Sequence, residues 1–173
     1  MTLLDRFKNI TTFILDVDGV LTDGTIYVFE NGEHVRRMSI KDGFALQLAV
    51  KKGYRILVIS GSNSPAVITR LKKLGITDIF MNILDKRKAV RQYMNDHHLT
   101  REQVLFMGDD IPDYVAMTEV GIPCAPSDAA PEIKNAALYI TGAAGGEGCV
   151  REVIEKVLKL NSHWELETDV PSR

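Results

Sequence analysis

FILDVDGVLT, at residues 13–22, is an apolar run that ends in two carboxylates, Asp16 and Asp18. Side chains two positions apart in extended backbone lie on the same side, so we expect both carboxylates to face the same way. Two such carboxylates repel each other unless a proton or a cation lies between them. The pair can hold Mg²⁺, or divide the roles of nucleophile and acid/base. With Gly19 allowing a sharp turn, the stretch predicts a buried strand that ends at a chemical site; a plain polar turn is the alternative.

The composition is that of a globular protein of ordinary domain size. The chain has 173 residues, of which 45% are hydrophobic and 25% charged, and its formal net charge is −2. This charge gives no electrostatic reason to expect nucleic acid or an anionic membrane as a partner. No apolar run approaches the span of a bilayer, and residues 1–6 do not resemble a signal peptide. Cys124 and Cys149 lack metal-ligand spacing, so we expect a reduced, cytoplasmic protein.

Short β-branched apolar runs alternate with longer amphipathic segments along the chain. This alternation predicts an α/β fold in one domain, residues 1–173, with a Rossmann-like parallel sheet and helices on both faces. The expected strands are Thr12–Asp16, Arg55–Ile59, Asp78–Met81, Val104–Met107, Gly121–Cys124 and Leu138–Ile140. The expected helices are Gly43–Lys52, Pro65–Leu74, Lys86–His97, Ile111–Glu119, Ala130–Asn135 and Cys149–Leu160.

Two segments interrupt this alternation. Residues 24–40 place Asn31-Gly32 between two extended runs, which predicts a β-hairpin that protrudes after the first strand. Apolar side chains at residues 26–29 fall on both faces of this ribbon, so we expect a partner surface to cover them; a hairpin folded onto its own sheet is the alternative. The second segment, residues 142–148, is glycine-rich and precedes the last helix, which ends at about residue 160. We expect it to be mobile, or to adapt to a ligand or neighbour.

Polar residues follow the expected strands at the edge where open parallel sheets bind ligands. In addition to the first pair, Ser60 with Gly61 behind it and Asp109, Asp110 and Asp113 follow strands, and Lys86 lies at the start of an expected helix. Carboxylates, a hydroxyl and an ammonium suit phosphoryl transfer. A carboxylate can attack phosphorus while Mg²⁺ offsets the repulsion between the anions. The hydroxyl and the lysine can hold the remaining phosphoryl oxygens.

Together these residues resemble the four motifs of the haloacid dehalogenase superfamily phosphatases. The matching motifs are Asp16–Gly24, Ser60-Gly61, Lys86, and Gly108-Asp109-Asp110 with Asp113. The likeness extends from about Phe13 to Leu160 and is greatest to the small, capless branch that acts on sugar acids. Residues 16–24, the hairpin and residues 145–152 resemble that branch in particular. Larger members insert a cap domain, whereas here only the hairpin fits between the first and second motifs.

The resemblance implies a role for each motif residue. Asp16 would be the nucleophile that becomes a phosphoaspartate, and Asp18 would protonate the leaving oxygen and then activate water. Mg²⁺ would be held by Asp16, the backbone carbonyl of Asp18, and Asp109. Asp110 and Asp113 would support the metal site. Ser60 and Lys86 would bind the phosphoryl group, with Gly61 beside the substrate.

The resemblance also implies a substrate and an assembly. The substrate would be a phosphorylated eight-carbon keto sugar acid of lipopolysaccharide precursor synthesis, hydrolysed by a homotetramer whose hairpins join the subunits. Arg70, Lys73 and Arg151 are the candidates to meet the sugar carboxylate, because cationic side chains bind such anions. For the first two, a solvated helix face is the alternative. Relatives often carry a charged residue where this chain has Ser62, and a Glu there is expected of nine-carbon phosphatases.

Three other functions are compatible with parts of the pattern. A sialic-acid-type nine-carbon phosphatase would use the same chemistry. A phosphorelay receiver domain also combines acidic residues, a hydroxyl and a lysine, but it takes its phosphoacceptor from a later strand. A catalytically silent oligomerisation module would not need the complete set of acidic, hydroxyl and lysine residues.

Overall fold

A six-stranded parallel sheet forms the centre of the computed structural model, which describes residues 2–166 and 169–173. The strand order is β5-β4-β1-β6-β7-β8, and every neighbouring pair is parallel. The predicted α/β fold is therefore confirmed. The strands are β1 (Thr12–Leu15), β4 (Arg55–Ile59), β5 (Asp78–Phe80), β6 (Val104–Met107), β7 (Ile122–Ala125) and β8 (Tyr139–Ile140).

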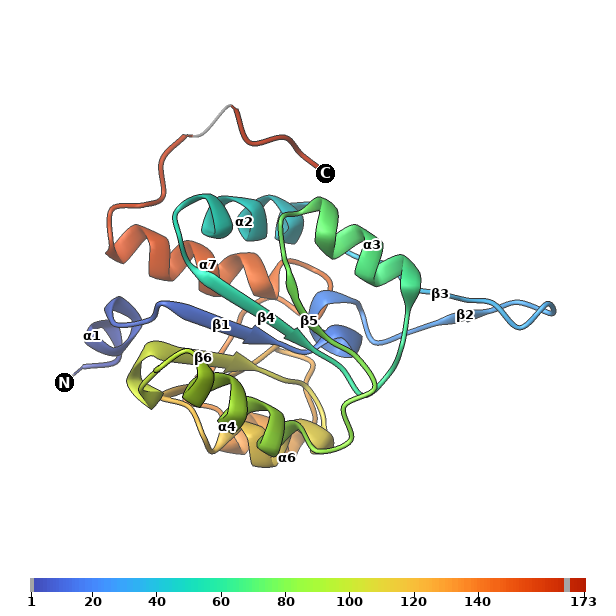
Figure 1. Ribbon diagram of the computed structural model, residues 1–173, viewed down its shortest axis with the longest axis horizontal. Coiled ribbons are helices and arrows are strands. Elements are labelled where there is room, and N and C mark those ends of the chain that lie inside the picture. The colour runs from blue at the N-terminus through green and yellow to red at the C-terminus, as the bar shows by residue number, and fades with distance from the viewer. Residues whose placement is uncertain (1, 167–168) are drawn as a thin grey trace.

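Alternate side chains of the central strands enter two separate hydrophobic cores. Phe13 and Leu15 pack into one core and Ile14 into the other, as the two-residue period of a strand requires. Helices cover both faces of the sheet (Figure 1). The first core is closed by α1 (Leu3–Lys8), α2 (Ile40–Lys51), α3 (Pro65–Lys73) and α7 (Cys149–Leu160). The second is closed by α4 (Lys86–Asp96), α5 (Tyr114–Met117) and α6 (Pro131–Ala136).

The position of β1 in the sheet decides where a ligand can bind. β1 lies between β4 and β6, and the chain fills one side of the sheet with β4 and β5 before it crosses to β6. In such a sheet the crevice at this change of direction, outside the carboxyl ends of the strands, is the usual ligand site. The segments that follow β1, β4 and β6 therefore meet at one edge.

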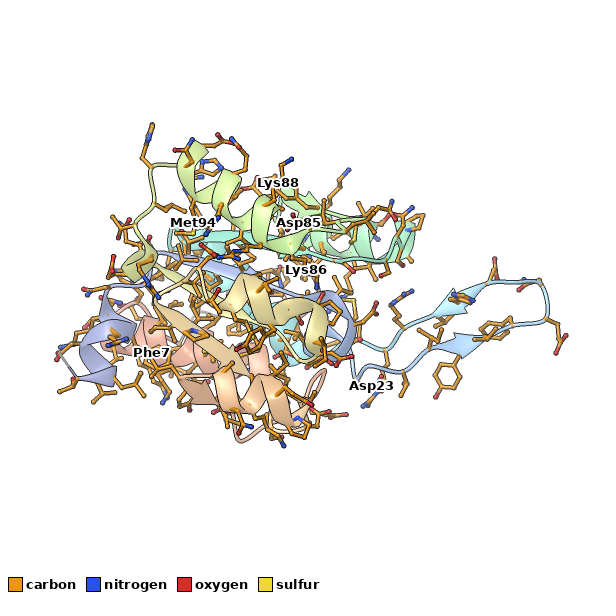
Figure 2. All side chains as sticks on the ribbon, turned by 90° about the horizontal axis from the view of Figure 1, so that it is seen from below. Phe7, Asp23, Asp85, Lys86, Lys88 and Met94 are labelled. Carbon is orange, nitrogen blue, oxygen red and sulfur yellow. The ribbon has the colours of Figure 1, made fainter. Side chains whose placement is uncertain are left out.

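A β-hairpin projects from this same edge, as the sequence predicts (Figure 1). Its strands are β2 (Tyr27–Val28) and β3 (His34–Val35), and the Phe29 N–H donates to the Glu33 carbonyl at 2.9 Å beside the turn. Tyr27 and Val28 are 65% and 66% exposed. Figure 2 shows Asp23 at the base of the hairpin and Phe7 at the opposite end of the molecule. The described part of the chain thus leaves the apolar ribbon uncovered.

The glycine-rich segment is packed against the loop that follows β1. Gly145 is buried, and a Cβ added there would overlap the Gly19 carbonyl oxygen and lie 3.0 Å from the Thr22 carbonyl oxygen. The Gly146 N–H donates to the Val20 carbonyl at 2.9 Å. Gly145 and Gly146 are therefore explained by close approach to the backbone of that loop, whereas composition alone predicted a segment that is mobile or adapts to a ligand or neighbour.

Two helical segments differ from the sequence expectation. α1 was not expected; it is capped reciprocally by Thr2 and Asp5, and its Phe7 is fully buried against Tyr139. The expected helix Ile111–Glu119 instead forms a tight turn, η3 (Ile111–Asp113), followed by the short α5. The Asp113 carboxylate accepts from backbone N–H groups that precede η3, which favours the tighter turn. Another short turn is η2 (Arg101–Gln103), and the other bounds differ from expectation by at most three residues.

Replacing Gly145 by Ala should destabilise the fold. The added methyl group would displace the loop after β1, and overpacking of this kind costs about 1–3 kcal/mol. At roughly 2–4 °C per kcal/mol for a chain of this size, the melting temperature should fall by about 3–10 °C. Gly142→Ala is the matched control, because its nearest contact would be at an ordinary 3.7 Å. Equal melting temperatures for both variants in calorimetry would show that the close packing is not required.

Candidate active site

A pocket of about 300 Å³ opens at the carboxyl ends of β1, β4 and β6. The segment after β1 contributes a broken helical turn, η1 (Val17–Leu21), in which Asp18 and Gly19 have non-helical backbone. Eight of the predicted site residues line the pocket: Asp16, Asp18, Ser60, Gly61, Lys86, Asp109, Asp110 and Asp113. Residues spread over about 100 positions of sequence thus meet at one edge of the sheet.

Lys86 lies between two carboxylates at the floor of this pocket. Its Nζ is 2.9 Å from Asp16 Oδ1 and 2.7 Å from Asp113 Oδ1, and the side chain is only 5% exposed. Burial lowers the pKa of Lys86, but Asp16 and Asp113 outweigh burial and raise it above its ordinary value. Asp85 places this ammonium by capping the start of α4 through the Lys88 N–H at 2.9 Å. The ammonium of Lys86 therefore forms ion pairs with two of the acidic groups at once.

Asp16, Asp109 and Asp113 form an acidic cluster that fits a divalent cation. One carboxylate oxygen from each lies within 4.8 Å of the other two. Burial raises the pKa of Asp16 to about 7, helped by the nearby Asp113 charge, and burial with the Asp113 and Asp110 charges raises that of Asp109 to about 7. A Cβ at position 19 would overlap the Asp109 carboxylate, so Gly19 lets this group approach the first loop. Partly buried oxygen ligands that repel one another suit Mg²⁺.

The Asp18 side chain belongs to a second group of contacts, apart from the acidic cluster. Its Oδ1 accepts from Arg36 Nε at 2.6 Å and its Oδ2 from the Ser62 hydroxyl at 3.0 Å. The Ser62 and Ser60 hydroxyl oxygens are 3.0 Å apart, and Ser60 is 2% exposed. Sequence reasoning missed Arg36, because nothing in its local pattern distinguishes it from a solvated hairpin residue.

The remaining candidates lie in different places. Asp110 is exposed at the rim, where its carboxylate caps η3 through the Ile111 N–H at 2.8 Å. Arg70, Lys73 and Arg151 are not among the described residues that line this pocket. Arg70 donates to the Arg173 carbonyl at 3.0 Å, and the Arg151 guanidinium lies over the Phe44 and Trp164 rings. Within one chain these three basic residues do not reach the candidate active site.

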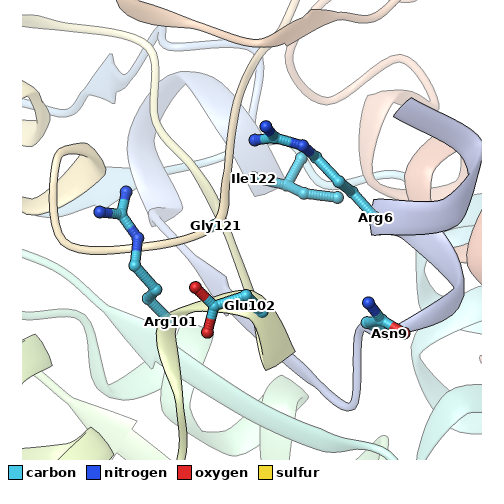
Figure 3. A pocket seen from close by; sticks show the side chains of 6 residues that line it. All are labelled: Arg6, Asn9, Arg101, Glu102, Gly121 and Ile122. Atoms are coloured by element: carbon cyan, nitrogen blue, oxygen red, sulfur yellow. The ribbon is translucent and has the colours of Figure 1, made fainter. Parts of the chain in front are cut away.

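A second cavity, of about 470 Å³, lies at the other end of the sheet, where strands begin (Figure 3). Arg6, Asn9, Arg101, Glu102, Gly121 and Ile122 line it. Its two arginines come from α1 and η2, and the Arg101 guanidinium already donates to the Val120 carbonyl at 3.0 Å. Among the described residues, this cavity is lined by one carboxylate and no lysine, whereas the first pocket gathers several carboxylates, a serine hydroxyl and Lys86.

Comparisons with known proteins give the family. The model of the haloacid dehalogenase-like hydrolases matches residues 72–153. The 3-deoxy-D-manno-octulosonate 8-phosphate phosphatase of Escherichia coli (strain K12) is 35% identical over 156 residues, which cover 90% of this chain and 83% of the relative. The chain belongs to the haloacid dehalogenase-like hydrolases. This membership excludes the phosphorelay receiver as its class.

Comparison with solved structures identifies the family within this class of hydrolases. The Yersinia pestis 3-deoxy-D-manno-octulosonate 8-phosphate phosphatase has a TM-score of 0.90 and 32% identity, with 93% of this chain and 87% of that chain covered. The Moraxella catarrhalis enzyme, solved with magnesium ion, phosphate ion and a KDO molecule, has a TM-score of 0.87 and 32% identity, with 91% and 90% covered. Within the class, the chain falls in the family of these octulosonate phosphate phosphatases.

Mg²⁺ should stabilise the protein strongly at pH 8 and weakly at pH 5.5. The pKa values of Asp16 and Asp109 are raised in the folded state, so folding takes up protons and the metal-free protein loses stability as pH rises from about 4 to 7. At pH 8 both carboxylates are ionised and can bind the ion, whereas protons compete below pH 7. Thermal unfolding in EDTA and in Mg²⁺ at both pH values measures this difference.

Asp109→Asn is the control for this measurement. It removes one charge from the acidic cluster, so both the pH-dependent loss of stability and the gain with Mg²⁺ should shrink. A gain with Mg²⁺ that is equally large at pH 5.5 and pH 8, or unchanged in Asp109→Asn, would place the cation elsewhere.

Proposed function

We propose that the protein is a Mg²⁺-dependent phosphatase that hydrolyses 3-deoxy-D-manno-octulosonate 8-phosphate to the free sugar acid and phosphate. The observation that carries this proposal is the meeting of Asp16, Asp18, Ser60 and Lys86 with the acidic cluster in one pocket. The relatives with this name, one of them solved with magnesium, phosphate and KDO, supply the substrate class. We assign residues 1–173 to a single phosphatase domain.

Asp16 is assigned as the nucleophile. The Val17 N–H donates to Asp16 Oδ1 at 2.7 Å and Lys86 contacts the same oxygen, so Oδ2 is the oxygen we assign to attack on phosphorus. The new Oδ2–P bond forms as the bond from phosphorus to the sugar oxygen breaks, which gives a phosphoaspartate. Asp18, two residues along and lining the same pocket, gives its proton to the departing sugar oxygen.

The second half of the reaction returns Asp16 to its free state. Asp18, now without its proton, takes one from a water molecule whose oxygen attacks the phosphorus. The Oδ2–P bond breaks, phosphate leaves and Asp18 is again protonated. One carboxylate thus acts first as acid and then as base, and no proton is left over.

The other pocket residues hold the phosphoryl group and its charge. Ser60 and Lys86 are assigned to the phosphoryl oxygens, since both are buried at the pocket wall. Mg²⁺, when bound by Asp16, Asp109 and the backbone carbonyl of Asp18, offsets the repulsion between the substrate and these carboxylates. Asp113 holds the Asp109 N–H at 3.0 Å as well as Lys86, and we assign it and Asp110 as supporting groups.

The eight-carbon substrate is favoured over the nine-carbon one by two observations. The relatives compared are named for the eight-carbon sugar acid, and Ser62 stands where a Glu is expected in nine-carbon phosphatases. The reaction would then lie in lipopolysaccharide precursor synthesis. We assign it to the cytoplasm, because both thiols are buried and free. Among the described residues, no helix has the length and apolar character of a membrane span.

We also propose a homotetramer joined through the hairpins. Ile26, Tyr27, Val28 and Phe29 are 45–66% exposed on a ribbon that its own chain does not cover. Exposed apolar area of this kind marks an interaction site. Arg70, Lys73 and Arg151, which do not line the pocket of their own chain, would bind the sugar carboxylate only at the site of a neighbouring copy.

Phosphate release in Mg²⁺ with the eight-carbon 8-phosphate and its nine-carbon 9-phosphate analogue tests the proposed function. We expect kcat/KM to favour the eight-carbon ester. Asp16→Asn should remove turnover of both esters, since an amide cannot attack phosphorus, while its circular dichroism spectrum shows the fold intact. Preference for the nine-carbon ester would correct the substrate. Turnover by Asp16→Asn near the wild-type rate would exclude the phosphoaspartate mechanism.

A charge in the hairpin should break the assembly. Val28→Asp puts a carboxylate on the exposed ribbon without touching the core, so the mass in light scattering should fall from four subunits toward one. Glu30→Gln, at the tip of the same hairpin, is the control that should leave the mass unchanged. A wild-type protein that is monomeric would rule out the hairpin interface.

A further inference from the structure

Arg36 brings a buried positive charge from the hairpin to the catalytic pocket. It follows β3 directly, and its side chain is only 10% exposed, whereas that of Arg37 next to it is 57% exposed. Arg36 Nε lies 2.6 Å from Asp18 Oδ1, and its Nη2 lies 3.4 Å from Oδ2. This is a forked contact to both carboxylate oxygens, which fixes the plane of the carboxylate as well as its position.

Ser62 completes the contact from the other side of the pocket. Its hydroxyl donates to Asp18 Oδ2 at 3.0 Å, and Arg36 Nη2 lies 3.5 Å from the same hydroxyl oxygen. A hydroxyl has one proton to give, so the proton between Ser60 and Ser62 belongs to Ser60. When the Ser60 hydroxyl donates to a phosphoryl oxygen instead, the Ser62 hydroxyl oxygen no longer accepts from Ser60. Its contact with Arg36 Nη2 remains.

The backbone at Asp18 explains why such a clamp is needed. Asp18 lies on non-helical backbone between β1 and the first turn, and 38% of its side chain is exposed. When Asp18 carries its proton on Oδ2, the Arg36 Nε contact on Oδ1 remains, and it must hold Oδ2 within hydrogen-bond reach of the leaving oxygen. When neighbouring residues do not fix the rotamer of a catalytic side chain on such a loop, the reaction that it catalyses slows.

We propose that Arg36 and Ser62 are positioning residues that clamp the Asp18 carboxylate in its acid/base geometry. This inference rests on the proposed phosphatase function and on the acid role of Asp18. It gives the hairpin a task inside its own subunit, since the base of the ribbon supplies the residue that orients the acid. Ser62, a small residue, leaves room for the guanidinium to reach Asp18.

The dependence of kcat/KM on the leaving group distinguishes a role in positioning the acid from a general disturbance of the active site. Phenolate leaves poorly without a proton, whereas p-nitrophenolate leaves readily, so loss of a positioned acid should harm phenyl phosphate far more. For Arg36→Gln we expect kcat/KM to fall about tenfold or more with phenyl phosphate, and less than about threefold with p-nitrophenyl phosphate. Arg36→Lys should recover part of the loss, because an ammonium can donate to one of the two oxygens.

Two further variants complete the experiment. Ser62→Ala should show the same leaving-group dependence with a smaller loss, and it tests the clamp if Arg36→Gln fails to fold. Arg37→Gln makes the same change of charge one residue away, where the side chain pairs with Asp23 and Glu147 instead, and should leave both substrates unaffected.

Equal losses on the two aryl phosphates, or no loss in Arg36→Gln and Ser62→Ala, would overturn the clamp. The aryl esters contain no sugar, so a wild-type protein that cleaves them but not the octulosonate ester would sink only the proposed substrate. A wild-type protein that cleaves no phosphate ester would overturn the proposed function and the clamp together.

Discussion

The ion contacts of Lys86 hold the candidate active site together. One buried ammonium lies 2.9 Å from Asp16, which follows β1, and 2.7 Å from Asp113, which lies in the turn η3 after β6. Without it, buried carboxylates would face one another with no compensating charge, and burial of unpaired charge is costly. The turn of η3, the cap of α4 and the loop after β1 all adopt the shapes that bring their groups to this cation.

The same edge of the sheet assembles a second, more exposed set of contacts around Asp18. Its partners come from the base of the hairpin and from the loop after β4. In the proposed mechanism, each set of contacts serves one carboxylate: the first serves Asp16 as nucleophile, and the second serves Asp18 as acid and base. Asp16 lies in the acidic cluster beside the ammonium, and Asp18 lies among hydrogen-bond donors outside it. Environments that differ in this way are how enzymes give two similar groups different tasks.

Much of the fold could be predicted because local patterns and packing agree. β4, β6 and α7 have the expected bounds, since an uninterrupted apolar run or a strong apolar face leaves little choice. Prediction failed where one particular contact overrides the local pattern. Ile111–Glu119 has a helical pattern, but Asp113 turns back to the Asp109 N–H and tightens the first turn. The glycine-rich composition of residues 142–148 indicates flexibility, yet Gly145 and Gly146 pack on the loop after β1.

By itself, the sequence determined the α/β class and the motif residues. The reason is that the carboxylates, the hydroxyl and the lysine each stand directly beside an apolar run or helix start that local pattern reveals. Only the tertiary structure decided which of these groups touch. It placed Asp113 with Asp16 and Asp109, and it turned Asp18 toward Arg36. It also kept Arg70 and Arg151 away from the pocket of their own chain. The physical reason is that spacing along a chain fixes which face a side chain takes, whereas its partners depend on strand order and loop packing.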